Sequence, residues 1–233
     1  MFKLKSDFTS NHKKYGGYSY EISKFISENT KILDIGCTTG KLAKVLKERG
    51  CDVTGLDIDP NSLKEAKKYC EKVHLCDLDQ FDTFCEVLPK NHFDAITMGD
   101  VLEHLKYPGV LLNQLKPYLK EEGGMIIASI PNAAFLSNRL KFLCGSFTYT
   151  KSGGLMDEDH LRFFSFKTAR QTISKSGYRV NKLYGVSTVR NRYWFLRLLA
   201  KVWPTLFAIH IIISANVIDE SNAKRKMKIK HKH

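Results

Sequence analysis

Residues 31–60 read KILDIGCTTG KLAKVLKERG CDVTGLDIDP, and this stretch decides the fold. It begins with an apolar strand pattern that runs into a turn containing Gly36 and Gly40. A helix is expected over 41–49, and a second strand then ends at Asp57. This order predicts half of a doubly wound α/β sheet, with a nucleotide site where the first strand meets the helix.

The same residues suit an adenosine ligand. Glycine lets the backbone approach a ligand, the helix N-terminus offers free N–H groups, and the acid at the second strand end can accept from ribose hydroxyls. The glycine spacing is G-x-x-x-G rather than the dinucleotide pattern G-x-G-x-x-G, and Asp34 would repel a pyrophosphate by about 1 kcal/mol or more. A ligand with an ammonium group and no phosphate, such as S-adenosylmethionine, fits better. A glycine turn without any ligand is the structural alternative.

The motif Asp34-Ile-Gly-Cys-Thr-Thr-Gly40 closely resembles the first motif of class I S-adenosylmethionine-dependent methyltransferases. The resemblance extends from Tyr18 to Val217. It implies a Rossmann-like α/β fold: a doubly wound, seven-stranded, mostly parallel sheet with an antiparallel strand near its edge and a cap inserted after the fifth strand. The motif departs at Thr38, where the family most often has glycine, and threonine narrows the conformational freedom of the turn.

The resemblance also implies which residues bind the cofactor, S-adenosylmethionine. Asp57 would bind the ribose hydroxyls, Asp77 would accept from the adenine amine while the Leu78 backbone donates, and Gly99 would pass close to the methionine part. A plain helix N-cap is the alternative role for Asp77. The full set of predicted cofactor residues is Asp34, Gly36, Cys37, Gly40, Asp57, Ile58, Asp77, Leu78 and Gly99.

Strands that alternate with helices predict a parallel sheet over the rest of the chain. The further expected strands are 72–76, 93–98, 125–130, 178–189 and 206–217, and the further expected helices are 18–26, 61–69, 79–88, 108–119, 166–176 and 194–203. We expect a single methyltransferase domain over 1–219. Within it, 131–165 is expected to be a cap that contacts the substrate, because long connections are often binding loops.

The composition of this 233-residue chain indicates its cellular compartment and its partners. The formal net charge is +13. A basic tail over 220–233 is expected to be disordered and solvated, with contact to nucleic acid or anionic lipid as the alternative. There is no apolar N-terminal run, and the six cysteines lack a C-x-x-C pair, so we predict buried, reduced thiols in a cytoplasmic protein. No membrane-spanning helix is expected. The alternative, a peripheral membrane contact, would use Trp194, Phe195 and Trp203.

The candidate catalytic residues follow the fourth and fifth strands. Three motifs resemble the subgroup that includes ubiquinone-biosynthesis O-methyltransferases: Asp100-Val-Leu-Glu-His-Leu105, Ser129-Ile-Pro-Asn132 and Asp159-His-Leu-Arg-Phe-Phe164. Methyl transfer to oxygen needs a collinear acceptor and a base. His160 and His104 are the candidate bases, with Glu103 beside them. The alternative for His104 is a purely structural histidine. The alternative for Glu103 is an acid that stabilises the start of a helix.

A metal site is a second interpretation of these residues, although the primary expectation is a mechanism without metal. Asp100, Glu103, His104 and His160 resemble the E-x-x-E-H…H divalent-metal site of small-RNA 2′-O-methyltransferases, with aspartate in place of the first glutamate. We predict methyl transfer to an oxygen, or as second choice a nitrogen, of a small molecule, with a sugar or polysaccharide precursor as a candidate. The alternatives are a metal-dependent RNA 2′-O-methyltransferase and a non-catalytic cofactor-binding protein.

Overall fold

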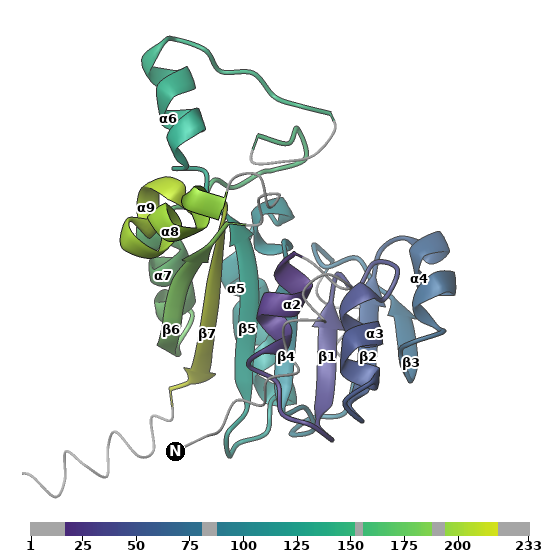
Figure 1. The fold of residues 1–233 in the computed structure, drawn as a ribbon. Coiled ribbons are helices and arrows are strands. Elements are labelled where there is room, and N and C mark those ends of the chain that lie inside the picture. The colour runs from purple at the N-terminus through teal and green to yellow at the C-terminus, as the bar shows by residue number, and fades with distance from the viewer. Residues whose placement is uncertain (1–16, 81–87, 152–155, 188–193, 219–233) are drawn as a thin grey trace, which may run out of the picture.

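The computed structural model describes residues 17–80, 88–151, 156–187 and 194–218. They form a seven-stranded sheet of order β3-β2-β1-β4-β5-β7-β6, with helices on both of its faces (Figure 1). The strands are β1 (Lys31–Ile35), β2 (Asp52–Asp57), β3 (Lys72–Leu75), β4 (Ala95–Gly99), β5 (Met125–Pro131), β6 (Tyr178–Val186) and β7 (His210–Val217). The helices are α2 (Tyr18–Ser23), α3 (Lys41–Lys47), α4 (Pro60–Ala66), η1 (Leu102–His104), α5 (Pro108–Leu115), η2 (Lys116–Tyr118), α6 (Leu136–Leu143), α7 (Phe166–Lys175), α8 (Trp194–Val202) and α9 (Pro204–Phe207).

The sheet is mostly parallel. Strands β1 to β5 pair in parallel, whereas β7 is antiparallel to both β5 and β6. The predicted doubly wound fold with an antiparallel strand near the edge is therefore confirmed. Parallel strands bring their carboxyl ends to one edge of the sheet. Gly36, Asp57 and Asp100 stand at or directly after three of these ends, so the candidate site is assembled along that edge.

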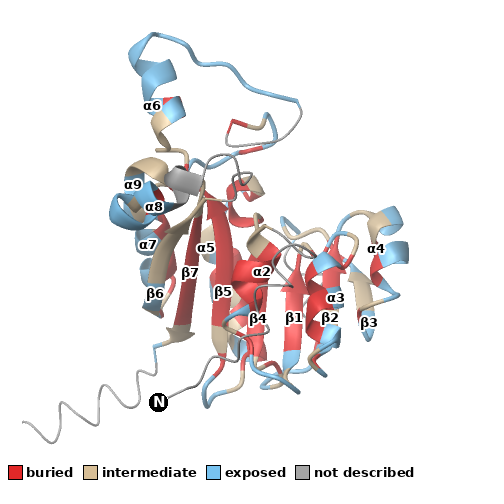
Figure 2. Cartoon of the chain, viewed as in Figure 1, coloured by how far each residue is buried: buried red, intermediate tan, exposed pale blue. Residues whose placement is uncertain are grey.

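The alternation of side chains along β1 decides where Asp34 points. Leu33 and Ile35 belong to the core cluster that includes α5 and α7, whereas Ile32 belongs to the cluster that includes α2 and α3. Asp34 shares the face of Ile32, because alternate residues of a strand face the same side. Its carboxyl group therefore lies on the side of α2 and α3. Buried residues extend along the central strands in Figure 2.

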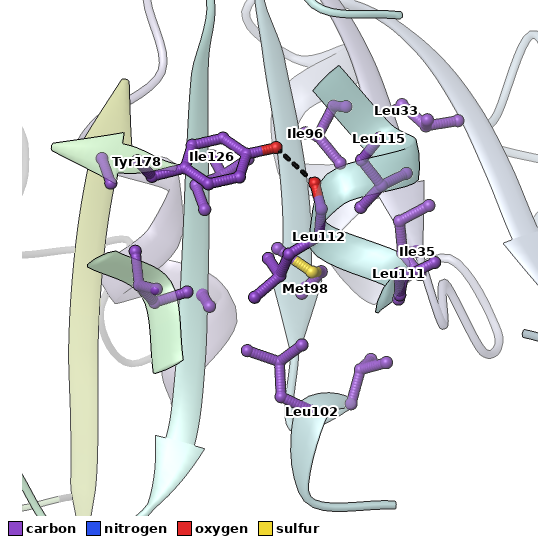
Figure 3. Packing of buried hydrophobic residues seen from close by; sticks show 14 of the residues in the cluster. Leu33, Ile35, Ile96, Met98, Leu102, Leu111, Leu112, Leu115, Ile126 and Tyr178 are labelled. Atoms are coloured by element: carbon purple, nitrogen blue, oxygen red, sulfur yellow. Dashed lines mark hydrogen bonds between the residues drawn. The ribbon is translucent and has the colours of Figure 1, made fainter. Parts of the chain in front are cut away.

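The larger core cluster joins the sheet to α5 (Figure 3). Leu111, Leu112 and Leu115 recur at helical spacing and are fully buried, as is Ile96 of β4. Burying a side chain of this size stabilises the fold by about 1.5–3 kcal/mol. Tyr178 of β6 is fully buried as well, and its hydroxyl donates to the Leu112 carbonyl at 2.7 Å, which satisfies the polar end of the ring.

Several predicted elements have different ends in the structure. The strand predicted over 206–217 begins only at His210, because Pro204 stands at the start of the short helix α9. The strand predicted over 93–98 begins at Ala95, since Phe93 forms only an isolated bridge with Leu119. The helix predicted over 108–119 is divided into α5 and η2 near Pro117.

Other predictions fall partly outside the described residues. Most of the helix expected over 79–88 and the whole tail expected over 220–233 lie in the undescribed ranges 81–87 and 219–233. The strand predicted over 178–189 ends as β6 at Val186, and 188–189 are not described. No helix of the described ranges is long and apolar enough to cross a membrane.

The segment between β5 and α7 projects beyond the carboxyl edge of the sheet as α6 and an extended loop (Figure 1). Partly exposed aromatic rings gather there: the ring centroid of Phe147 lies 5.2 Å from those of Phe142 and Tyr149. The segment is anchored to η1, because the N–H groups of Leu161 and Arg162 both donate to the Glu103 carbonyl at 2.9 Å.

The cysteines differ in exposure. Cys37, Cys51, Cys70 and Cys76 are free and buried, as predicted. The prediction is wrong for Cys144, which is free and exposed. It directly follows α6 on the projecting segment, much of which has the pale blue of exposed residues (Figure 2). Cys85 lies outside the described residues.

Candidate active site

The turn after β1 is held by backbone hydrogen bonds. The Cys37 N–H donates to the Leu56 carbonyl at 3.0 Å, and the Gly40 N–H donates to the Cys37 carbonyl at 2.9 Å. Gly36 and Gly40 have φ values of 67° and 77°, which glycine adopts without strain. Thr38 has a φ of 46° in the same turn. The turn therefore accommodates threonine in place of the family's usual glycine at a cost of about 1–2 kcal/mol of backbone strain.

Asp57 ties this turn to the second strand. Its Oδ2 accepts the Thr38 N–H at 2.8 Å, and its Oδ1 accepts the Asp59 N–H at 2.9 Å. Each carboxylate oxygen retains a second lone pair, so the capacity to accept from ribose hydroxyls remains. The capping of α4 is performed instead by Asp59, whose side chain accepts from the N–H groups of Asn61 and Ser62.

The predicted adenine end is formed by a turn after β3. Asp77 Oδ1 accepts the Asp79 N–H at 3.0 Å, and its Oδ2 accepts from the Gln80 side chain at 2.9 Å. Both bonds lie within the turn that follows β3. The adenine contacts of Asp77 and Leu78 stay predictions. Ile58 is 64% exposed and offers an apolar surface to a flat ring at the same edge of the sheet.

Asp34 is buried beneath the turn. The Thr97 hydroxyl donates to its Oδ1 at 2.7 Å across the pairing of β1 with β4. Burial raises the pKa of Asp34 to about 7, while the Thr97 hydrogen bond lowers it and the Asp57 charge raises it further. The carboxyl group therefore gains its negative charge near neutral pH, and the charged form suits an ammonium group of a ligand.

The affinity for S-adenosylhomocysteine should therefore depend on pH. Because the raised pKa leaves Asp34 neutral below about pH 7, and only its charged form attracts the ligand ammonium, we expect binding about tenfold weaker at pH 6 than at pH 8. Calorimetric titration at both pH values checks this. Asp34→Asn, which keeps an acceptor for Thr97, should bind with nearly equal affinity at both. Equal pH dependence in the two proteins would contradict the role of Asp34.

Tyr18 of α2 is a site residue that the sequence did not indicate. Its ring covers Gly99, where a Cβ atom would come within 2.5 Å of it. Burial first, and then the charges of Asp100, Asp34 and Glu103, raise the pKa of Tyr18 to about 12. The periodicity over 18–26 predicted a helix, but it contained no signal for this contact. Tyr18 and Gly99 line one small cavity together with Ser19, Asp34, Gly36, Cys37, Thr38, Lys41 and Leu42.

A second cavity of about 400 Å³ lies at the carboxyl end of β4. Gly99 lines the first cavity and its neighbour Asp100 lines the second, so both cavities reach this strand end. The second cavity brings together the predicted catalytic residues with side chains from the projecting segment and from β7. Its lining is Asp100, Glu103, His104, Pro131, Phe135, Asp157, His160, Ile209 and His210.

Glu103, His104 and His160 form a compact group in this cavity. One potential ligand atom from each lies within 4.8 Å of the others. Neither Glu103 oxygen has a hydrogen-bond partner among the described residues, although the side chain is buried. Burial, and then the charge of Asp100, raise the pKa of Glu103 well above its usual range. His104 Nδ1 lies 3.1 Å from the Asp159 carbonyl, which can only accept, so its Nε2 is left as the acceptor nitrogen.

Asp100 does not join that group. Its Oδ1 accepts from the Ser129 hydroxyl at 2.6 Å, and its Oδ2 lies 3.2 Å from His210 Nε2. The four-residue cluster predicted from the E-x-x-E-H…H resemblance is therefore a three-residue group in the structure. His210 has no counterpart among the predicted site residues, because the sequence pattern indicated only a buried strand at its position.

Comparison with known proteins identifies the family. The family described as "Methyltransferase domain" matches residues 11–183. The chain belongs to this methyltransferase family. Its fold is similar to those of S-adenosylmethionine-dependent methyltransferases from Archaeoglobus fulgidus (TM-score 0.61, 19% identity, 90% of this chain and 99% of that one) and Listeria monocytogenes (putative; TM-score 0.62, 16% identity, 88% and 99%).

Curated relatives match part of this methyltransferase. The ubiquinone biosynthesis O-methyltransferase of Bradyrhizobium diazoefficiens is 32% identical over 100 residues, which cover 43% of this chain and 40% of that protein. The protein of the same name from Glaesserella parasuis is 36% identical over 111 residues, which cover 45% and 47%. The matches thus span less than half the length of these relatives.

S-adenosylmethionine is the cofactor of this methyltransferase. Residues of the first cavity and of the neighbouring end of β2 suit it chemically, because they supply carboxyl groups for an ammonium and for ribose hydroxyls. Asp34 would hold the ammonium, Asp57 the ribose hydroxyls, and Lys41 at the start of α3 the carboxylate. When bound, the cofactor supplies a methyl group that is already activated by its positive sulfur.

Proposed function

We propose that this methyltransferase transfers the methyl group to a hydroxyl oxygen of a small molecule, with an amine nitrogen as second choice. The observation that supports it most is that Gly99 lines the cofactor cavity while its neighbour Asp100 lines a second cavity of about 400 Å³, which is large enough for a small acceptor. The names of the curated relatives agree with an oxygen acceptor. Those names contain no sugar, so a sugar is not the preferred acceptor.

The charges of the second cavity favour a neutral or cationic acceptor. Its described lining contains three carboxyl groups, those of Asp100, Glu103 and Asp157, and no lysine or arginine. A phosphate or carboxylate brought beside the carboxylates of Asp100 and Asp157 would be repelled. This argues for a neutral small molecule and against the RNA alternative, whose backbone is anionic. The apolar side chains of Phe135 and Ile209 suit a ring that carries hydroxyl groups.

Titration calorimetry and a methyl-transfer assay test this function together. We expect S-adenosylhomocysteine to bind, and we expect methylation of protocatechualdehyde, a neutral ring diol, with kcat/KM at least about tenfold higher than for the carboxylate protocatechuate. Failure to bind S-adenosylhomocysteine would refute cofactor use. Binding without methylation of any hydroxyl compound would favour the non-catalytic alternative, and salt-sensitive binding of a short single-stranded RNA would favour the RNA alternative.

We also propose that Glu103, His104 and His160 hold a divalent cation rather than act as free bases. A buried carboxylate without a partner is costly, and a cation would satisfy both of its oxygens. The contact from His104 Nδ1 to the Asp159 carbonyl is the kind of outer hydrogen bond that orients a ligating imidazole. One carboxylate and two imidazoles suit ions such as Mn²⁺. Such an ion would supply positive charge that polarises an acceptor hydroxyl.

A further inference from the structure

We propose that Asp100 accepts the hydrogen bond and then the proton of the acceptor hydroxyl, and that Ser129 and His210 hold its carboxylate at the methyl-transfer point. This inference rests on the proposed function, since it assigns a residue to the proton of the same reaction. Asp100 becomes a catalytic residue in this view, whereas Ser129 and His210 are positioning residues that act through it.

The backbone at Asp100 is strained and fixed. Asp100 has a φ of 54°, in the left-handed region that residues other than glycine seldom occupy. Its N–H group donates to both the carbonyl and the hydroxyl oxygen of Ser129, each at 3.1 Å. Strain of this kind persists only where the surrounding structure enforces it, and it gathers at functional sites.

The carboxylate of Asp100 is held on both sides. The Ser129 hydroxyl, on a fully buried residue, donates to Oδ1 at 2.6 Å, and His210 Nε2 lies 3.2 Å from Oδ2. His210 Nδ1 is buried and has no partner among the described residues. A hydrogen on Nε2 therefore lets His210 donate to Asp100 without leaving a buried N–H group unpaired at Nδ1.

Asp100 lines one cavity and directly follows a residue that lines the other. Its side chain keeps 22% of its surface exposed and lines the acceptor cavity, while Gly99 before it borders the cofactor cavity under Tyr18. The Glu103 group lies in the same cavity but does not include Asp100. The Glu103 group can therefore orient the acceptor while Asp100 takes its proton.

The proton transfer balances charge within the site. Asp100 accepts the hydroxyl proton as the acceptor oxygen bonds to the methyl carbon and the carbon–sulfur bond breaks, leaving its electron pair on sulfur. A positive sulfonium and a negative carboxylate become a neutral thioether and a carboxylic acid. Charge that is neutralised in a partly buried site needs little solvent reorganisation.

Sinefungin tests this assignment without an acceptor or turnover. This analogue of S-adenosylhomocysteine carries an ammonium group where the transferred methyl would stand. If Asp100 faces that point, sinefungin should bind the wild-type protein at least about tenfold more tightly than S-adenosylhomocysteine. Asp100→Asn should abolish this preference and leave S-adenosylhomocysteine binding within about threefold. Asp157→Asn, which removes another carboxylate of the same cavity, should retain the preference.

Variants of the positioning residues separate orientation from folding. His210→Leu and Ser129→Ala should each reduce the preference for sinefungin at least about threefold, whereas His210→Gln, which keeps a donor at the Nε2 position, should restore it. S-adenosylhomocysteine affinity serves as the folding control in every variant. Unchanged preference in Asp100→Asn, with S-adenosylhomocysteine still bound, would overturn the assignment and leave the proposed function standing. If the wild-type protein does not bind S-adenosylhomocysteine, both the Asp100 assignment and the proposed function are refuted.

Discussion

Replacing Asp57 with alanine should weaken S-adenosylhomocysteine binding at least about 100-fold. Two hydrogen bonds from ribose hydroxyls to a carboxylate are worth about 1.5–3 kcal/mol each, and both are lost. The variant also frees the Thr38 and Asp59 N–H groups, which the carboxylate holds at 2.8 and 2.9 Å. The turn that receives the cofactor thus loses its tie to β2 as well. Titration calorimetry measures the change in affinity.

Asp59→Ala is the matched control, because Asp59 stands two residues away and caps α4 instead. Loss of this cap should lower the free energy of unfolding and change the affinity little. An Asp57→Ala protein that binds within about threefold of the wild type would contradict the ribose role.

Replacing Glu103 with alanine should abolish stabilisation by Mn²⁺. If Glu103, His104 and His160 bind the ion, Mn²⁺ at about 100 times its dissociation constant should stabilise the wild-type protein by about 2.7 kcal/mol. For a chain of this size that is a rise in Tm of about 5–10 °C. Differential scanning fluorimetry with and without Mn²⁺ measures it, and no acceptor is needed. Methyl transfer should also fall at least about tenfold with a chelator and recover on addition of metal.

His74→Ala provides the control for this experiment. His74 is a partly buried histidine on β3, outside the Glu103 group, and its replacement should leave the Mn²⁺ shift intact. An equal Mn²⁺ shift in the wild-type and Glu103→Ala proteins would remove the metal proposal. Full activity in the presence of chelator would do the same, and it would return His104 and His160 to the role of candidate bases.

The sheet could be predicted from the sequence because its signals are local. The apolar run at 31–35, the glycines of the turn and the acid that ends β2 each depend on a few neighbouring residues, and the structure retains the predicted order of elements. The errors lie where a local pattern competes with a backbone constraint. Leu206 and Phe207 continue the apolar run of β7, yet Pro204 begins a helical turn there, so the strand starts only at His210.

The candidate site was only partly predictable, because cavities are made by residues distant in sequence. Glu103, His104 and His160 were found through a motif. Tyr18 and His210 could not be, since one comes from a helix before β1 and the other from the start of the last strand. The partners of Asp100 likewise come from β5 and β7, which meet only through the antiparallel pairing that places Pro131 opposite His210.

The exposed thiol of Cys144 provides a means of observing the projecting segment in solution. Cys144 is the exposed cysteine among those described, and it stands at the end of α6, beyond the carboxyl edge of the sheet. With Cys85 replaced by serine, a maleimide fluorophore would attach selectively there, because buried thiols react slowly. Its emission would then report, in real time, whether α6 approaches the sheet as cofactor and acceptor enter.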